Sequence, residues 1–246
     1  MGGDDWLERY QRGEQEQVWH ELRLLGDRVR DTEHFAAAQA VCDEMARRAR
    51  RNVETLVERL AEQGYRFHSN DNDKQPLAPF IPATAKAADL ADWLEKHVGP
   101  LPMTVASWLR LVGDVWLAGT HPQWPESLEA DPFVIQLEGS HYPQSSIKDS
   151  IESECDDWRQ WGPAAGCPFV LSVAPDRLTK ANISGGPPYG FRLPDPCADG
   201  LFKTEIDTPF VAYLNRVFRA GGFPGRAGGE NRWEIIRSLR EGMLPL

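Results

Sequence analysis

The chain has 246 residues, a hydrophobic content of 41% and a formal net charge of −10. This length and apolar content suffice for a folded protein with its own core, and the acidic excess argues against binding nucleic acid through its phosphates. No apolar run is long enough to span a membrane. The polar, acidic N-terminus also lacks the features of a signal peptide, so we expect a cytoplasmic protein that is not membrane-bound.

The first third of the chain has the pattern of helices. Between residues 15 and 65, apolar residues recur every three or four positions and Gly64 ends the run. The main stripe consists of Val41, Met45, Ala49, Val53, Leu56, Val57 and Leu60. We therefore predict an N-terminal helical section over residues 1–67, followed by a Pro-rich loop over residues 68–84.

Residues 85–246 predict a second domain with strands as well as helices. Helices are expected at 85–98, after Pro102, within 145–161, from Thr208-Pro209 and around Trp233. Strands are expected at 115–118, 133–137, 169–173 and 189–193, with a Pro-rich loop at 119–132. This order predicts an α+β fold, in which helices flank a mixed, mostly antiparallel sheet.

Two glycine-rich segments interrupt these elements. Ser184-Gly185-Gly186-Pro187-Pro188 cannot form a helix, so it predicts a turn between two strands. Residues 221–229 lack the Lys-Ser/Thr of a phosphate-binding loop, and a helix-ending turn explains their glycines better. Phe223, within that segment, is interpreted as a plug for the core.

The segment from Leu101-Pro102 through a helix to Gly113-Asp114 and a strand resembles the SUKH superfamily. The turn at 184–190 and the closing helix that starts at Thr208-Pro209 also fit its layout, so the resemblance covers residues 86–246. The resemblance implies a non-enzymatic domain that binds other proteins, as an immunity protein that neutralises a toxin or as a scaffold or regulator. The family has no shared catalytic residues, so none is assigned.

An acidic segment is the candidate partner-binding site. Five carboxylates fall within nine residues, and two tryptophans follow them. Carboxylates at this density steer a basic partner such as a toxin domain, and tryptophan is enriched among residues that dominate binding energy. The simpler alternative is a solvated helix with its tryptophans in the core. The residues are Asp149, Glu152, Glu154, Asp156, Asp157, Trp158 and Trp161.

Metal and cofactor sites are not expected. Cys42, Cys155, Cys167 and Cys197 have irregular separations without a Cys-x-x-Cys pair, which predicts buried free thiols. The acidic segment lacks the glycine turn of a calcium loop. The sequence leaves the oligomeric state and the identity of a partner open.

Two other functions remain open. An enzyme could use His121 or His141 with the aspartates at the corners, Asp176, Asp195 and Asp199, although turn chemistry explains these aspartates better. A structural subunit of a larger assembly could use the helices of residues 15–65, and an exposed apolar stripe on them would support that reading.

Overall fold

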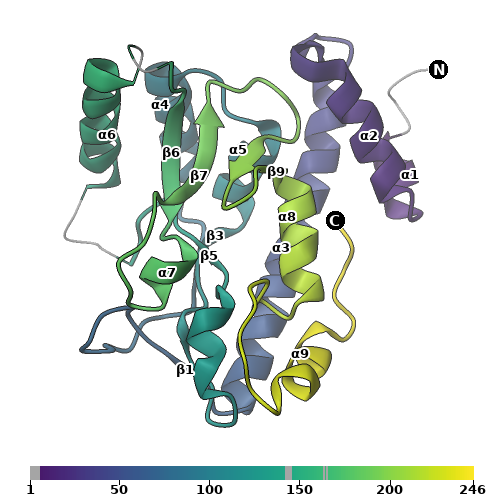
Figure 1. Ribbon diagram of the computed structural model, residues 1–246. Helices are drawn as coiled ribbons and strands as arrows, with labels where there is room; N and C mark the ends of the chain where they lie inside the picture. Colours follow the sequence, from purple (N-terminus) through teal and green to yellow (C-terminus); the bar gives the residue numbers. More distant parts are fainter. Residues whose placement is uncertain (1–5, 142–145, 163, 165) are drawn as a thin grey trace.

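The computed structural model describes residues 6–141, 146–162, 164 and 166–246. The chain begins with α1 (Trp6–Gln11), α2 (Gln15–Leu25), the 3-10 helix η2 (Gly26–Arg30) and α3 (Phe35–Glu62). In Figure 1, α3 descends behind α8 along most of the molecule, and α1 and α2 pack beside its upper part. The predicted N-terminal helical section is therefore present.

The apolar stripe of α3 faces the core. Val41, Met45, Ala49 and Leu60 are fully buried, and Val57 is partly buried against the same cluster. After the helix, Gly64 adopts a positive φ of 74° and the Tyr65 amide donates to Leu60 O at 2.9 Å. Glycine takes this conformation at little steric cost, so it ends the helix as the sequence predicts.

The middle of the chain alternates short strands and helices. Its elements are β1 (Arg66–Phe67), β2 (Phe80–Pro82), α4 (Ala87–Val98), α5 (Met103–Leu111), β3 (Gly113–Trp116), β4 (Gly119–Thr120), the 3-10 helix η3 (Pro125–Ala130) and β5 (Val134–Ile135). The prediction of an unbroken loop at 68–84 is wrong at β2, which pairs antiparallel with β3. Pro82 is tolerated there because it lies at the end of an edge strand, where no ladder donor is needed. Likewise, β4 and η3 lie within the predicted loop at 119–132.

Gly113 and Asp114 form a tight junction between α5 and the sheet. Gly113 has a φ of 106°, and a Cβ atom there would lie 2.3 Å from the carbonyl oxygen of Ile81 in β2. The buried Asp114 carboxylate accepts the backbone amides of Leu137 and Ser140, each at 2.7 Å. The close approach of β2 thus requires the glycine, and the aspartate ties β3 to the segment after β5.

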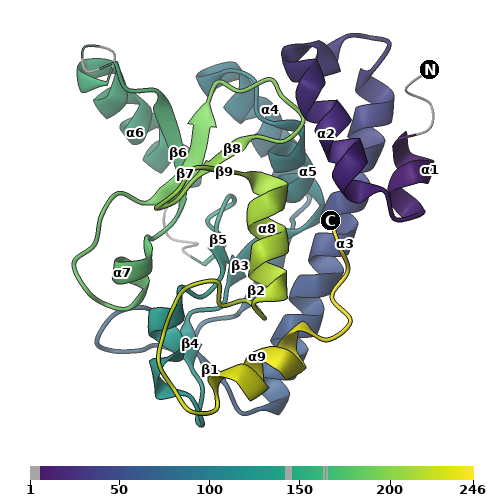
Figure 2. The same cartoon turned by 45° about the vertical axis from the view of Figure 1, so that its right-hand side comes forward.

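The last part of the chain supplies the largest sheet. It contains α6 (Ile147–Trp161), β6 (Phe169–Ala174), α7 (Arg177–Lys180), β7 (Tyr189–Leu193), β8 (Leu201–Lys203), β9 (Thr208–Pro209), α8 (Phe210–Arg219) and α9 (Arg232–Arg240). The four-stranded sheet has the order β6-β7-β8-β9, beside the three-stranded β2-β3-β5 and the two-stranded β1-β4. The Gln136 amide donates to Val173 O at 2.8 Å and joins the first two sheets. Antiparallel sheets with flanking helices (Figure 2) confirm the α+β class.

The C-terminal helices close the core. Thr208-Pro209 forms strand β9, so α8 begins just after the predicted start, at Phe210. Tyr213 packs on Phe202 with ring centroids 4.5 Å apart. Phe223 is 1% exposed and contacts the rings of Tyr65 and Trp124, which confirms that it plugs the core.

The N-terminal helices are tied to later segments by buried and half-buried contacts. Arg23 of α2 pairs with the buried Asp199 at 2.6 Å, and Asn52 of α3 donates to Leu244 O at 2.9 Å. The division into residues 1–67, 68–84 and 85–246 stays a prediction. None of the helices in the described part of the chain combines the length and apolar composition that a bilayer span needs.

Candidate functional site

The acidic segment forms helix α6 at one edge of the molecule (Figures 1 and 2). Ser146 caps it, since its hydroxyl accepts the Asp149 amide at 3.2 Å. Only a narrow stripe, Ile151 and Cys155, is buried on this helix. The opposite face is therefore open to solvent.

All five predicted carboxylates belong to exposed residues of α6, although one of them, Glu154, lies next to Ser172 of β6. Asp149, Glu152, Glu154, Asp156 and Asp157 are exposed, and the same helix carries the cations Lys148 and Arg159. Arg159 pairs with Asp156 at 2.7 Å, but both side chains are more than half exposed. An exposed pair of this kind adds little stability, so the helix presents a net negative surface that a partner can use.

Glu154 differs from the other carboxylates because it lies against β6. Partial burial raises the pKa of its carboxyl, and hydrogen bonding to Ser172 offsets this only in part. The other four carboxylates are exposed to solvent, and the ion pair of Asp156 with Arg159 is weak. Their side chains are therefore not held in the fixed positions that a catalytic or metal site would need.

A small hollow lies between α4 and α6. It measures about 240 Å³ and is lined by Trp93 and His97 of α4 and by Glu152, Cys155, Asp156 and Arg159 of α6. Trp93 and His97 stack with centroids 4.2 Å apart, and the Lys148 ammonium lies 5.3 Å from the Trp93 ring. The hollow thus already contains cations of the chain itself, since Lys148 lies near the Trp93 ring and Arg159 pairs with Asp156.

The two tryptophans of the predicted site have different surroundings. Trp158 is half-buried, donates from Nε1 to Cys167 O at 2.8 Å and packs edge-on against Phe169. Trp161, at the end of the helix, is 69% exposed. Trp158 thus anchors α6 to the following segment, while Trp161 is available to a partner.

The histidines of the enzyme alternative contact neutral groups. His121 is buried; its Nε2 lies 3.1 Å from Gln63 Oε1, and its Nδ1 accepts the Gln123 amide. Burial lowers the pKa of His121. His141 Nε2 lies 2.6 Å from Ala78 O. Neither contact supplies the carboxylate partner that this alternative invokes.

Two of the corner aspartates, Asp176 and Asp195, stabilise local turns, as the sequence favours, whereas Asp199 makes long-range contacts. Asp176 Oδ1 caps α7 by accepting the Leu178 amide at 2.9 Å, and Asp195 Oδ1 accepts the Cys197 amide at 3.0 Å. Asp199 accepts the Val211 amide at 3.0 Å and pairs with Arg23. Burial raises the pKa of Asp199 despite this pairing.

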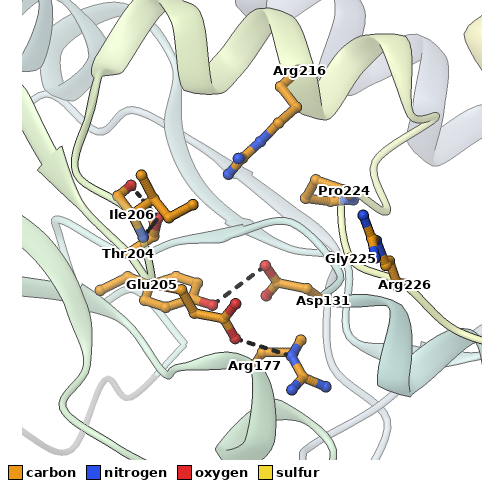
Figure 3. A pocket seen from close by; sticks show the side chains of 10 residues that line it. Asp131, Arg177, Thr204, Glu205, Ile206, Arg216, Pro224, Gly225 and Arg226 are labelled. Atoms are coloured by element: carbon orange, nitrogen blue, oxygen red, sulfur yellow. Dashed lines mark hydrogen bonds and ion pairs between the residues drawn. The ribbon is translucent and has the colours of Figure 1, made fainter.

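A second site, absent from the sequence predictions, is a cavity of about 500 Å³ lined by residues of α7, α8 and the segments after η3 and β8 (Figure 3). Arginines from three different elements line it: Arg177 of α7, Arg216 of α8 and Arg226 of the loop before α9. Asp131 lies at its base. The cavity is thus lined mainly by positive charge, although the protein as a whole has a net charge of −10.

Asp131, at the base of this pocket (hereafter the arginine pocket), is held by two buried side chains, Lys180 and Tyr189. The Lys180 ammonium lies 2.7 Å from Asp131 Oδ1, and the lysine side chain has no exposed surface. Tyr189 donates its hydroxyl to Asp131 Oδ2 at 3.4 Å, and the ammonium lies 4.8 Å from the Tyr189 ring. Both oxygens of Asp131 are therefore engaged within the protein.

The sequence carries weak signals of this pocket. Lys180 lies four residues after the cap Asp176, a spacing that places it at the end of one helical turn. Gly225 belongs to the segment interpreted as a turn, and a Cβ atom there would lie 2.8 Å from Ala130 and Asp131. No local pattern shows that Arg177, Arg216 and Arg226 converge, because they come from separate elements.

Comparisons of the chain with models of protein families, with curated proteins and with solved structures find no match. The SUKH resemblance therefore stays a prediction. Within the described residues, no group of three or more His, Cys, Asp or Glu side chains has an arrangement that could hold a metal ion. Cys42 and Cys155 are buried free thiols as predicted, whereas Cys167 is exposed and Cys197 partly buried.

Proposed function

We propose that this protein binds another protein that presents a basic surface, with α6 as the contact. One observation carries the proposal: an edge helix exposes Asp149, Glu152, Asp156 and Asp157 next to the 69% exposed Trp161. Tryptophan is enriched among the residues that dominate the binding energy of protein interfaces. Here the aromatic side chain coincides with the carboxylate cluster that the sequence singles out.

The two parts of this surface act differently. The carboxylates accelerate association with a cationic partner and select against acidic ones. Trp161 supplies apolar area that is removed from water in the complex.

The finer role follows from the SUKH resemblance. We propose that the chain is an immunity protein, which neutralises a toxin by covering the basic surface around its active site. A complex of ordinary size buries on the order of 1,600 Å² in total, enough to cover such a surface. A partner without toxicity would instead favour the role of scaffold or regulator.

Charge reversal on α6 tests this proposal. The variant Asp156→Lys/Asp157→Lys is compared with Glu58→Lys/Glu62→Lys, which makes the same charge change on the exposed face of α3. The tagged wild-type chain is used to capture partners from the native cell, and the partner is identified by mass spectrometry. Its binding to each purified variant is then measured at low and at physiological salt.

We expect the α6 variant to bind the partner at least about tenfold more weakly at low salt, mainly through slower association. The α3 variant should bind nearly as the wild type does. Equal affinity of all three proteins, or a partner with an acidic contact surface, would overturn the proposal. Toxicity of the partner, relieved by co-expression of this chain, would establish the immunity role.

A further inference from the structure

We propose that the arginine pocket binds a small molecule through a phosphate group, independently of the protein contact at α6. Three arginines, Arg177, Arg216 and Arg226, line this one cavity (Figure 3). Guanidinium groups form paired hydrogen bonds with phosphate oxygens and stay charged at all physiological pH values. Because three arginines line the same cavity, an anion is the ligand whose charge complements it.

Two of these arginines have no carboxylate partner among the residues that the structure describes. Within the described part of the chain, Arg216 and Arg226 are exposed and form no ion pair with a carboxylate. Arg216 extends from α8 into the cavity above Asp131, and its guanidinium lies 5.6 Å from the ring of Tyr213 on its own helix. Both cations are therefore available to a ligand without loss of an existing ion pair.

The carboxylates that line the pocket do not cancel this charge. Asp131 is neutralised by the buried Lys180 and by the Tyr189 hydroxyl. Glu205 pairs with Arg177 at 3.2 Å, but its side chain is 69% exposed. Such an exposed pair is weak, so a phosphate can replace Glu205 as the partner of Arg177. Glu205 thus competes with the ligand for this arginine.

The backbone around the pocket is fixed in place. The Gly225 amide donates to Ala130 O at 2.9 Å, and Arg232 donates to Gly225 O and Ala227 O, each at 2.9 Å. These bonds hold the loop that carries Arg226 against the end of η3. A site that is already ordered loses little conformational entropy when a ligand binds.

The size of the cavity indicates the class of ligand. A volume of about 500 Å³ exceeds that of a single phosphate ion and lies in the range of pockets for small organic ligands. Ile206, which is 71% exposed, and Pro224 add apolar surface beside the arginines. We therefore assign the pocket to an organic phosphate of the size of a sugar phosphate or mononucleotide.

Calorimetry with the full-length protein tests this assignment. The probes are glucose 6-phosphate, AMP, inorganic phosphate and citrate, each titrated at low salt. The variants are Arg216→Ala, Arg226→Ala and Glu205→Gln. Arg219→Ala serves as the control, because Arg219 is also exposed on α8 but lines a different hollow.

We expect one organic phosphate to bind more tightly than inorganic phosphate and citrate. Arg216→Ala and Arg226→Ala should each weaken that binding at least tenfold, and Arg219→Ala should change it less than twofold. Glu205→Gln should strengthen it severalfold, since the competitor for Arg177 is removed.

Absence of binding by both organic phosphates at millimolar concentration would overturn the proposal. So would inorganic phosphate or citrate binding as tightly as the better organic phosphate, or binding that Arg216→Ala and Arg226→Ala leave intact. A loss of affinity in Glu205→Gln would also contradict it, because Glu205 would then be a ligand contact and not a competitor. All four substitutions lie at exposed positions, so the fold is expected to survive them.

Discussion

The face of α6 and the arginine pocket use charge in opposite ways. On α6, the carboxylates are exposed, and Asp156 has a partner, Arg159, that is itself 57% exposed. In the arginine pocket, Lys180 and Asp131 are buried, and their 2.7 Å contact fixes the base of the cavity. The exposed carboxylates of α6 therefore act on a partner through their electrostatic potential. The buried ion pair of the arginine pocket instead fixes the positions of the residues that line the cavity.

This difference separates the properties that each region controls. Solvated charges govern association rate and salt dependence and have little effect on folding. A buried ion pair is coupled to folding, because either partner left alone is a desolvated charge. Substitutions in the two regions should therefore change different measurements.

Removal of one partner of an ion pair gives the sharpest contrast between the regions. Asp131→Ala leaves the Lys180 charge buried and unpaired, and should lower the free energy of unfolding by about 3–5 kcal/mol. Asp156→Ala breaks the exposed pair with Arg159 and should lower it by about 0–1 kcal/mol. Urea denaturation measures both values.

The double variant Asp131→Leu/Lys180→Met is the control for this effect. It removes both charges, so we expect much of the lost stability to return. Equal losses for Asp131→Ala and Asp156→Ala would contradict the distinction between buried and solvated charge.

The two tryptophans of α6 sharpen the same comparison within one helix. Trp158→Ala removes a half-buried ring and its hydrogen bond to Cys167 O, and should lower the free energy of unfolding by about 1–3 kcal/mol. Trp161→Ala should change it by less than about 0.5 kcal/mol. It should weaken partner binding by about 2 kcal/mol. Thermal denaturation and titration of the partner separate the two effects, and a large stability loss for Trp161→Ala would contradict the assignment.

The pH dependence of stability gives a smaller effect, whose direction is predicted for each region. Asp176, near the arginine pocket, is partly desolvated, but hydrogen bonds from Thr179 and from backbone amides outweigh this and lower its pKa. Its folded-state pKa lies below the unfolded value near 3.8, so its contribution is present above that pH and disappears as the pH falls through the folded value. Asp176→Ala should therefore cost about 0.5–2 kcal/mol at neutral pH and less in acid.

For Glu154 on α6, stability should change with pH in the opposite direction. Burial raises its pKa above 4.5, so the folded state binds more protons and stability falls as the pH rises through the folded-state pKa. Glu154→Gln should therefore be slightly more stable than the wild type at neutral pH, and the difference should vanish in acid. Denaturation curves between pH 3 and 7 compare both variants, and slopes of the same sign for the two sites would contradict these assignments.

Most helices could be predicted because their signals are local. The stripe of α3, the Gly64 terminus and the helix within 145–161 depend on neighbours in the sequence, and the structure confirms them. Strand β2 was missed because its pairing with β3 depends on Gly113, a residue 31 positions after Pro82 that allows the two backbones to approach. The division of the sheet into three parts depends on contacts of the same long-range kind.

The candidate sites show the same limit. The carboxylates of α6 are adjacent in sequence, so one helix exposes them together. The residues of the arginine pocket come from four separate parts of the chain: Asp131 follows η3, Arg177 lies in α7, Arg216 in α8 and Arg226 in the loop before α9. Only the fold brings them together. The two tryptophans could not be told apart by sequence, because their exposure depends on the position of the segment around Cys167 and Phe169.

Site-specific photo-crosslinking in the native cell tests most directly whether α6 is the binding surface. A photoreactive amino acid replaces Trp161 in one protein and Leu24 in the other; both positions are highly exposed and apolar, at 69% and 74%, but lie on helices at opposite sides of the molecule (Figures 1 and 2). We expect position 161 to crosslink one protein with a basic surface and position 24 to crosslink none. A partner that crosslinks at position 24 and not at 161 would contradict binding through α6.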